Sequence, residues 1–463
     1  MDLLELYAGS IAELPELLDS RESRVLRQQE LLRHAPAVSC LISFTLNIPG
    51  PVKRFPLAEQ AFAEGLGQIR RILKAGGVEI IQSEEKREKT GCEALLLISS
   101  VSAGIKDLMR ELEDSHPLGR LFDADVLDRE GKKLSRREGK ERACLICGGP
   151  AGICARSRAH GLDEIRREAA RILRDYFTNA FEDALVYRMQ RALLTEAAVT
   201  PKPGLVDRFN NGAHKDMDIF SFQASAAVLG PYLRRFIRAG ILHGERPPGE
   251  LFPLLRPIGI AAEEAMLAAT GGVNTHRGII FSMGIGGAAL GIQHGLARKT
   301  ELRELSRLCG EIARPVLKDF ERIKGAAQLS HGERLYAVKG ITGIRGEAAA
   351  GFPLVFNCAI PVLRRGLEKG MSLNDAAVIT LLHLITRVED TNCITRSSPE
   401  TFKHTQEEIL EALPRIEETG DMEAVFEIDK RFIAGNLSPG GCADLLALAL
   451  FFNSLRDVHP LKL

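Results

Sequence analysis

The amino-acid sequence predicts a multi-domain protein in which an N-terminal α+β domain is followed by a C-terminal all-α domain. A chain of 463 residues is too long for one ordinary core, because domains usually span about 100–200 residues. Short β-type runs alternate with helical patterns in the first third, whereas apolar residues recur at helical spacing in the remainder. We therefore predict domains at residues 1–175 and 176–463.

The individual elements follow from these patterns in chain order. A helix is predicted over residues 20–35 (SRESRVLRQQELLRHA), and strands over residues 38–48, 92–99 and 120–127. The charged segment 160–177 reads as a helical bridge to the second domain. Beyond it, segments such as 182–198 (EDALVYRMQRALLTEAA) are typical of helices, and Gly/Pro-rich polar loops interrupt them.

Composition excludes several classes of protein. Lys+Arg and Asp+Glu both number 61, so no domain-wide basic surface for nucleic acid is expected. The first residues carry acids and lack a basic segment followed by an apolar one, so we expect a cytoplasmic protein with free cysteines. The stretch Gly278–Ala297 lacks Lys, Arg, Asp and Glu. Because it is rich in Gly and Ala, it predicts a buried helix approached closely at Gly284, Gly287 and Gly291, and no membrane span.

An acidic pair in LFDADVL is the main indication of chemistry in the N-terminal domain. Alternate side chains of a strand share one face, so Asp123 and Asp125 project together. Two carboxylates suit Mg²⁺, which would neutralise a triphosphate during attack by a hydroxyl. Phosphate contacts are expected from Arg120 and from Lys53 and Arg54, which follow a proline-stiffened turn. The alternatives are an acidic edge strand and a solvated loop.

A cysteine-rich segment ends the N-terminal domain. Cys144, Cys147, Cys154 and His160 have the spacing C-x2-C-x6-C-x5-H. Three thiols and an imidazole can complete the tetrahedral shell of a structural zinc ion. A redox-active or simply buried cysteine pair is the alternative interpretation.

Five polar, glycine-rich loops interrupt the helices of the C-terminal domain, and together they predict one large site for a metal-bound polyphosphate. The acids expected to hold Mg²⁺ or to transfer protons are Asp207, Asp216, Asp218, Glu264 and Asp390. The residues expected to contact phosphate or nucleotide are Lys202, Arg208, His214, Lys215, Gly271, Gly272, Asn274, Thr275, His276, Arg277, Arg345, Glu347, Arg387, Asn392, Gly440 and Gly441.

Two of these loops carry a more specific expectation. Asn274 or Thr275 should cap the Gly/Ala-rich helix, whose first N–H groups would then point at an anion. His383, Arg387 and Asp390 have the spacing i, i+4 and i+7, which places them on one helix face. That face either turns toward the site or forms a salt-bridged surface.

The N-terminal motifs resemble a known family. Arg24–Gln28, IPGPVK, HPLGRLFDADV and RACLICGGPAGICARSRAH are similar to the CitX-type apo-citrate lyase phosphoribosyl-dephospho-CoA transferases, over about residues 15–170. The resemblance implies transfer of a phosphoribosyl-dephospho-CoA unit from a triphosphate donor to a serine of the citrate lyase acyl carrier protein, with release of pyrophosphate. It also implies a nucleotidyltransferase-like fold with Mg²⁺ at Asp123 and Asp125.

The C-terminal motifs resemble a second family. TPKPGLVDR, GAHKDMD, ATGGVNTHRG, RGEAAAGFP, EDTN and SPGGCADLL are similar in order to the CitG-type triphosphoribosyl-dephospho-CoA synthases, over about residues 185–463, although Cys442 stands where Ser is more frequent. The resemblance implies that ATP and 3′-dephospho-CoA are substrates and that adenine is displaced from the anomeric carbon. Such glycosyl transfer needs an acid, a base or carboxylate near the sugar, and a metal on the triphosphate.

The two implied reactions belong together, because the product of the second domain is the donor for the first. Two alternatives stay open at this point. One is the related pathway that modifies malonate decarboxylase. The other is a zinc-containing assembly factor that binds the carrier protein or a CoA-like ligand without chemistry.

Overall fold

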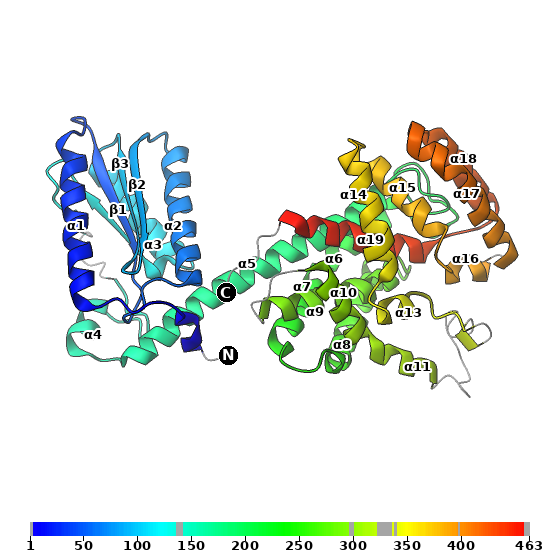
Figure 1. Cartoon of the computed structure of the whole chain (residues 1–463), viewed down its shortest axis with the longest axis horizontal. Coiled ribbons are helices and arrows are strands. Elements are labelled where there is room, and N and C mark those ends of the chain that lie inside the picture. Colours follow the sequence, from blue (N-terminus) through cyan, green and yellow to red (C-terminus); the bar gives the residue numbers. More distant parts are fainter. Residues whose placement is uncertain are drawn as a thin grey trace. The chain divides into compact units, whose positions relative to one another are not determined.

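The computed structural model describes residues 3–135, 142–295, 301–321, 336–337, 340–396 and 399–457. The chain folds into two compact units that meet in the sequence between Ala180 and Phe181 (Figure 1). We call the first the sheet unit and the second the helical unit. All strands of the described ranges lie in the sheet unit, and the regular elements described in the helical unit are helices. This confirms the predicted succession of an α+β and an all-α architecture.

The sheet unit alternates helices and strands along the chain. Its elements are η1 (Leu3–Tyr7), α1 (Leu14–Arg33), β1 (Cys40–Leu46), α2 (Pro56–Ala75), β2 (Ile80–Glu88), β3 (Gly91–Ile98), α3 (Ser102–Ser115), η2 (Gly119–Leu121), β4 (Phe122–Leu127), α4 (Ala151–Ser157) and the first part of α5 (Leu162–Ala198). The three predicted strands correspond to β1, β3 and β4, and the predicted helix at 20–35 falls on α1.

The four strands form one antiparallel sheet in the order β2-β3-β1-β4. In the central strand β1, Ile42 lies opposite Leu96 of β3 on one side and Val126 of β4 on the other. The same sheet face carries Phe44, whose ring stacks on Phe62 of α2 at 5.3 Å between ring centroids. This apolar face, covered by α2, forms the main core of the unit.

The opposite face of the sheet is apolar at one end and polar at the other. In Figure 1, α1 lies on the side of the sheet away from α2. Its C-terminal turn closes a small core made of Leu31, Leu32, Ala35, Leu41, Leu95, Leu97 and Leu127. Nearer its middle, the Gln28 amide donates a hydrogen bond of 3.0 Å to Ser43 of β1. The polar end of this face carries the acidic pair described below.

Strand β2 was not predicted from the sequence. Its sequence IIQSEEKRE is almost entirely exposed or half-buried, because β2 is an edge strand that pairs only with β3. An edge strand with one solvated side lacks the apolar run or clean alternation that marks a buried strand. The charges at Glu84, Glu85 and Lys86 also suit an edge that must not pair with another chain.

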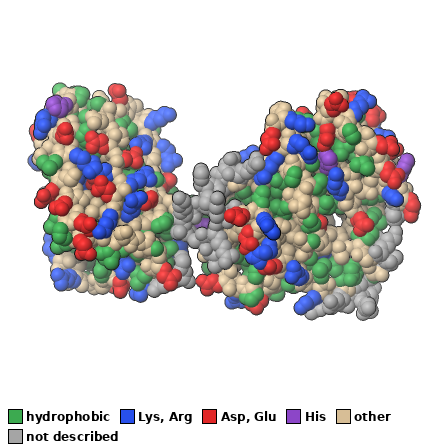
Figure 2. Space-filling view, in the orientation of Figure 1, with side chains coloured by type: hydrophobic (Ala, Val, Ile, Leu, Met, Phe, Trp, Pro, Cys, Tyr) green, Lys and Arg blue, Asp and Glu red, His purple; other side chains and the backbone are tan. Residues whose placement is uncertain are grey.

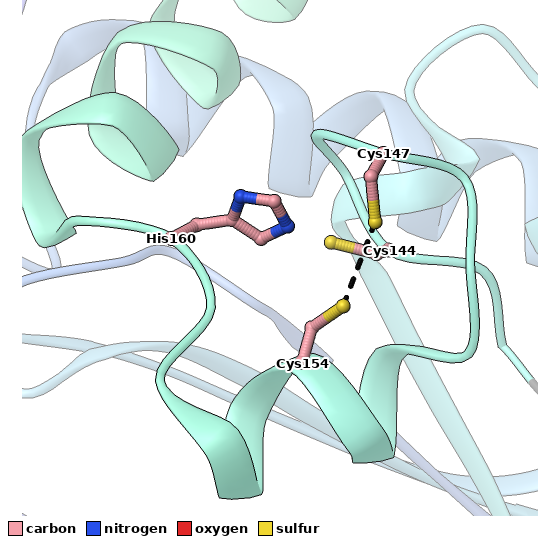
Figure 3. Close-up of side chains that lie close together, drawn as sticks. All are labelled: Cys144, Cys147, Cys154 and His160. Atoms are coloured by element: carbon pink, nitrogen blue, oxygen red, sulfur yellow. Dashed lines mark hydrogen bonds between the residues drawn. The ribbon is translucent and has the colours of Figure 1, made fainter.

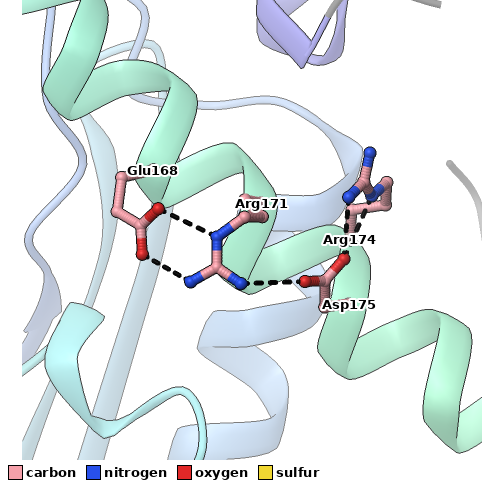
Figure 4. Close-up of polar contacts among 4 residues, drawn as sticks. All are labelled: Glu168, Arg171, Arg174 and Asp175. Atoms are coloured by element: carbon pink, nitrogen blue, oxygen red, sulfur yellow. Dashed lines mark hydrogen bonds and ion pairs between the residues drawn. The ribbon is translucent and has the colours of Figure 1, made fainter.

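Helix α5 confirms the helix predicted over the charged segment 160–177. Figure 4 shows its polar surface, where Arg171 bonds Glu168 at 2.6 and 2.9 Å and Asp175 at 3.1 Å. Arg174 reaches the same Asp175 carboxylate at 2.9 Å. These partners lie three or four residues apart or are adjacent, and the i,i+3 and i,i+4 pairs support a solvated helix.

The helical unit begins with the rest of α5. Its further elements are α6 (Ile219–Val228), α7 (Gly230–His243), η3 (Pro248–Leu251), α8 (Phe252–Ala269), α9 (Arg277–Gly295), α10 (Leu302–Ala313), η4 (Arg314–Leu317), α11 (Lys318–Glu321), α13 (Gly343–Ala349), the π-helix η5 (Val355–Ala359), α14 (Ile360–Glu368), α15 (Leu373–Ile385), α16 (Thr391–Arg396), α17 (Pro399–Thr419), α18 (Met422–Ala434), α19 (Gly440–Asn453) and η6 (Ser454–Asp457).

Helix α9 is the buried Gly/Ala-rich helix that the sequence predicts. It is described up to Gly295, since residues 296–300 lie outside the described ranges. Its glycines face neighbouring helices: Gly284 meets the Phe236 ring, Gly287 meets Ile237, and Gly291 meets the backbone of α7. Because these positions carry no side chain, α7 packs against α9 at backbone distance.

The surface of the protein carries charges of both signs, as the balanced composition predicts. On the face shown in Figure 2, Lys and Arg side chains are interspersed with Asp and Glu side chains over both units. Within the described ranges, no helix combines the length and the apolar character needed to cross a bilayer. All nine cysteines are free thiols.

The packing of α9 on α7 predicts a position-specific cost for added volume. In Gly291→Ala the new Cβ would collide with the carbonyl oxygen of Ile237, so we expect the free energy of unfolding to fall by about 1–3 kcal/mol. Gly259→Ala in α8 is the matched control, because a Cβ there meets only Phe236 at 3.9 Å. Helix propensity alone should make that control neutral or slightly stabilising. Equal loss in both variants, measured by urea denaturation, would contradict the close-packing argument.

Candidate functional site

The helical unit contains a cavity of about 310 Å³ where several of the predicted loops meet. The predicted site residues that line it are Lys202, His214, Asp216, Asn274, Thr275, His276, Arg277, Asn392 and Gly440. They come from the loop between α5 and α6, the start of α9, and the starts of α16 and α19. The cavity thus gathers residues from segments that are far apart in the sequence, from Lys202 to Gly440.

A buried ion pair forms one wall of the cavity. The Lys202 ammonium donates hydrogen bonds of 2.6 Å to the Glu196 carboxylate and 2.8 Å to the Glu196 carbonyl oxygen. Only 1% of the Lys202 side chain and 4% of the Glu196 side chain are exposed. The pair therefore ties the first loop to the last turn of α5. Neither charged group is accessible to water, so each depends on the other for its interaction.

His276 lies beside this pair as a neutral imidazole. Burial, and secondarily the charge of Lys202, lowers the pKa of His276 to about 3. Its Nδ1 is 2.6 Å from the hydroxyl of the fully buried Ser225 on α6. Its Nε2 has no hydrogen-bond partner within the described ranges. Because Ser225 holds Nδ1 of the uncharged His276 ring, Nε2 is the nitrogen that can bond a ligand.

A second histidine, His214, joins the start of α19 to the first loop. Its Nε2 lies 2.7 Å from the Ser438 hydroxyl, and its Nδ1 lies 3.4 Å from the Arg396 guanidinium. Burial and the charge of Arg396 lower the pKa of His214. Asp216, 4.0 Å from the same ring, is 67% exposed.

The N-terminus of α9 is closed by side chains of the protein. Asn274 caps the helix, because its side-chain oxygen accepts the Arg277 N–H at 3.2 Å. The carboxyl group of Asp444 on α19 interacts with the Ile279 N–H. The predicted capping by Asn274 is therefore confirmed. The Ile279 N–H is thus engaged by a carboxyl group of the protein, and the binding of an anion at the first N–H groups stays a prediction.

Asp390 holds two loops together. It is fully buried, and it accepts N–H groups of Asn392 at 2.9 Å, Cys393 at 3.1 Å and Gly441 at 2.8 Å. Burial raises the pKa of Asp390, and these hydrogen bonds oppose that shift. Part of the predicted face is confirmed, because the Arg387 guanidinium lies 3.0 Å from the His383 Nδ1. The placement of Asp390 on the same helix face is wrong, because α15 ends at Ile385.

The other predicted acids lie outside the cavity. Asp207 accepts the N–H groups of Phe209 at 2.6 Å and Asn210 at 2.9 Å, which folds the loop on itself. Asp218 caps α6 by accepting the Ser221 N–H. Glu264 is exposed on α8, whereas its neighbour Glu263 pairs with Arg277, as expected when adjacent helical residues diverge by about 100°.

The remaining predicted phosphate contacts also lie outside the cavity, and most have partners of their own. Arg208 bonds Thr200 and Asn374, Arg387 bonds His383, Arg345 lies over the Phe320 ring, and the Glu347 carboxylate accepts the Leu354 N–H at 2.6 Å. Lys215 is exposed. Gly271 and Gly272 form the positive-φ turn after α8, and the Gly441 N–H serves Asp390.

The predicted site residues leave out several residues that line the cavity. Glu196, Arg396, Ser438 and Asp444 all line the cavity. A signal existed for two of them. Glu196 follows Met189 and Leu193 at helical spacing on the apolar side of α5, and Asp444 precedes the wholly apolar LLALALFF. An acid on the buried side of a helix needs a partner or a function.

The sheet unit places Asp123 and Asp125 together, as predicted. They alternate with buried neighbours on β4 and lie opposite Thr45 and Ser43 of β1. Each carboxylate has a cation beside it: Arg142 lies 3.7 Å from Asp123, and Lys133 lies 2.5 Å from Asp125.

The predicted basic residues of this unit have intramolecular partners. The Arg120 guanidinium donates to the Ala143 carbonyl oxygen, and the Arg54 guanidinium pairs with Glu59 at 2.6 Å. The Lys53 ammonium turns back to the Ile48 carbonyl oxygen at 2.6 Å, and burial lowers the pKa of Lys53.

Cys144, Cys147, Cys154 and His160 converge on one point (Figure 3), with one ligand atom of each within 4.8 Å of the others. The Cys147 and Cys154 sulfurs are 3.5 Å apart. The Gly149 amide and the side chains of His160 and Cys154 lower the pKa of Cys147 to about 6, while Cys147 raises the pKa of Cys154 to about 11. The His160 Nε2 is buried and has no hydrogen-bond partner within the described part of the chain.

Comparison with known proteins divides the chain at the same region. Residues 12–176 match the CitX family, described as apo-citrate lyase phosphoribosyl-dephospho-CoA transferase, and residues 182–462 match the CitG family, described as ATP:dephospho-CoA triphosphoribosyl transferase. Protein CitXG of Haemophilus influenzae is 32% identical over 97% of both chains, and Protein CitXG of Leuconostoc mesenteroides is 33% identical over 98% of this chain and 99% of the relative. The 2-(5″-triphosphoribosyl)-3′-dephosphocoenzyme-A synthase of Klebsiella pneumoniae is 42% identical over 59% of this chain and 91% of the relative.

The buried ion pair in the cavity wall yields a stability prediction. Lys202→Met leaves the Glu196 carboxylate buried without its cation, so we expect the helical unit to lose about 3–5 kcal/mol of unfolding free energy. Lys430→Met, which removes an exposed lysine paired with Glu427, should leave the unfolding transition unchanged. Thermal and urea denaturation of the two variants would contradict this account if both were equally stable.

Proposed function

We propose, from the premise that this chain belongs to the CitX and CitG families and joins them in one polypeptide, that it makes a prosthetic group and attaches it. The C-terminal domain converts ATP and 3′-dephospho-CoA into 2′-(5″-triphosphoribosyl)-3′-dephospho-CoA and adenine. The N-terminal domain transfers the phosphoribosyl-dephospho-CoA unit to a serine of the citrate lyase acyl carrier protein and releases pyrophosphate. The observation that carries the proposal is the match of each half to its own family over nearly its full length.

The cavity of the helical unit supports the synthase reaction. A triphosphate needs cations and hydrogen-bond donors, and Lys202, Arg277, Arg396 and the neutral His276 all line the cavity. Displacement of adenine builds positive charge at the anomeric carbon, and the carboxylates on the same walls would stabilise that charge. The triphosphate stays on the ribose that is transferred.

Mg²⁺ fits the oxygen-rich side of this cavity. Asp216 is exposed and has no Lys or Arg partner within the described ranges. The buried Thr275 hydroxyl likewise has no hydrogen-bond partner there. These oxygens, with the side-chain oxygen of Asn274, would hold the ion, which supplies neutralisation of the triphosphate charge.

For the sheet unit we propose a nucleotidyltransferase-like site at Asp123 and Asp125. Both carboxylates project from one face of β4, beside the hydroxyl side chains of Thr45 and Ser43. Mg²⁺ would be held by the two carboxylates, and Arg142 and Lys133, which now neutralise them, would be released toward the phosphates of the donor. This chemistry is in-line attack of the carrier serine at the α-phosphorus.

The two-site proposal predicts separable activities. Wild-type protein should release adenine only when ATP, dephospho-CoA and Mg²⁺ are all present, and should modify the apo-carrier with release of pyrophosphate. The double variant Asp123→Asn with Asp125→Asn should lose carrier modification by a factor of at least about 10³, because the metal ligands are gone, and should keep adenine release. Chromatography of adenine and mass spectrometry of the carrier measure the two steps.

The matched control is Glu168→Gln with Asp175→Asn, which also removes two arginine-paired acids from the sheet unit. Both activities should survive in this control. Loss of both activities in the Asp123 and Asp125 variant would show that the steps are not independent. Absence of adenine release from the wild type would refute the synthase assignment.

We also propose that Cys144, Cys147, Cys154 and His160 hold a structural zinc ion. Three sulfurs and one imidazole nitrogen are a donor set that zinc binds tetrahedrally. The orphaned Nε2 of His160 would be the nitrogen ligand, and Glu164, 3.8 Å from Nδ1, would orient the ring from its other side. The ion would fold the segment around α4, and the proposed transfer reaction passes through none of these residues.

Metal analysis tests the zinc proposal. Protein purified without chelators should carry one zinc ion per chain, and Cys144→Ser should lose most of it because a ligand is removed. Cys92→Ser, a change at a buried thiol of β3 outside the cluster, should keep the zinc. Zinc bound equally by the wild type and by Cys144→Ser would rule out this site.

A further inference from the structure

We infer that Asp444 is the general acid that protonates the departing adenine in the cavity of the helical unit. This inference rests on the synthase function proposed above and deepens it, because it assigns the role of acid to one carboxyl group. Asp444 is on α19 and lines the cavity together with the start of α9.

Protonation of the departing adenine requires an acid that faces the cavity and still carries its proton at neutral pH. Within the described ranges, the carboxyl groups on the cavity wall belong to Glu196, Asp216 and Asp444. Glu196 is bonded to the Lys202 ammonium at 2.6 Å, so its carboxylate already has a cationic partner. The Asp216 side chain is 67% exposed and lies 4.0 Å from the His214 ring.

Asp444 differs from both in its surroundings. No Lys, Arg or His lies within ion-pair distance of it in the described part of the chain. Burial, and then the negative charges of Glu196 and Asp390, raises the pKa of Asp444 well above its ordinary value. The Ile279 N–H favours the charged form but is outweighed. Asp444 is therefore the cavity carboxyl group that can donate a proton.

The backbone of α9 fixes the direction of this group. Gly278 lies so close to Asp444 that a Cβ at this position would collide with the carboxyl oxygen Oδ2. The carboxyl oxygen Oδ2 thus lies against the start of α9, where Gly278 leaves the space that it occupies. A proton donor held in one position before the ligand binds loses less entropy in the transition state.

The proton balance of the step is complete. Asp444 gives its proton to a ring nitrogen of adenine while the bond from the anomeric carbon to N9 breaks and its electron pair stays on the base. The ribose hydroxyl of dephospho-CoA forms the new bond to the anomeric carbon, and its proton passes to water. Asp444 then takes a proton from water before the next turnover.

Leaving-group dependence tests this role. In Asp444→Asn the rate of adenine release from ATP should fall by about 10²–10⁴, the usual contribution of general acid catalysis. With ATP methylated at N7, whose base leaves without needing a proton, the same variant should react within about tenfold of the wild type. Calorimetric affinities for ATP and dephospho-CoA should stay within about threefold, and the melting temperature is measured alongside.

Two further variants keep the test decisive. Gly278→Ala retains the carboxyl group but displaces it, so it should also slow the reaction with ATP more than the reaction with the methylated analogue. Asp429→Asn changes an acid whose pKa is likewise raised by burial, but which lies outside the cavity and bonds the Gly204 N–H. It should slow both substrates equally, if at all.

The outcomes are distinct. A wild type that releases no adenine from ATP would defeat the proposed function itself. A wild type that is active, with an Asp444→Asn variant that is equally slow on both substrates or fully active on ATP, would defeat the assignment of Asp444 and leave the function standing.

Discussion

The close approach of α7 and α9 is the constraint on which the helical unit depends. Glycines along α9 let neighbouring backbones pack at a distance that any side chain would prevent, as at Gly291 against Ile237. Helix α9 is buried along most of its length from Ile279 onward, whereas its first residue, Arg277, is exposed and lines the cavity. Several polar loops meet at this end of the helix, so the packing that surrounds α9 also positions the cavity walls.

Three carboxylates near this cavity support the loops. Asp207 and Asp390 accept backbone N–H groups, and Asp429 joins the Gly204 N–H to the Asn210 amide at 2.8 Å each. These carboxylates replace hydrogen bonds that the irregular backbone cannot make with itself. On the cavity wall that these loops form, the His276 Nε2 has no hydrogen-bond partner within the described ranges.

The sequence was sufficient for the helical and mixed architectures, for three of the strands, for the buried helix and for the clustering of the polar loops. It could not separate Asp216, which faces the cavity, from Asp207, which folds its own loop, because both lie in one short polar segment and differ only in tertiary contacts. Glu196 was overlooked because it sits in a helix outside the polar loops. Asp444 belongs to the SPGGCADLL motif but was not assigned to the site, because an acid in the first turn of a helix is favoured without any function. Strand β2 was overlooked because solvent covers its charged side.

Helix α5 carries a consequence for the fused chain as a whole. The two family matches end at residue 176 and begin at residue 182, and both positions lie within this continuous helix. Its later residues belong to the helical unit, where the Phe181 ring stacks on His294 at 3.9 Å. Proteases cleave exposed loops, whereas residues 176–182, where the two family matches adjoin, are helical. The maker and the user of the activated donor therefore stay in a one-to-one ratio in the cell for as long as the polypeptide survives.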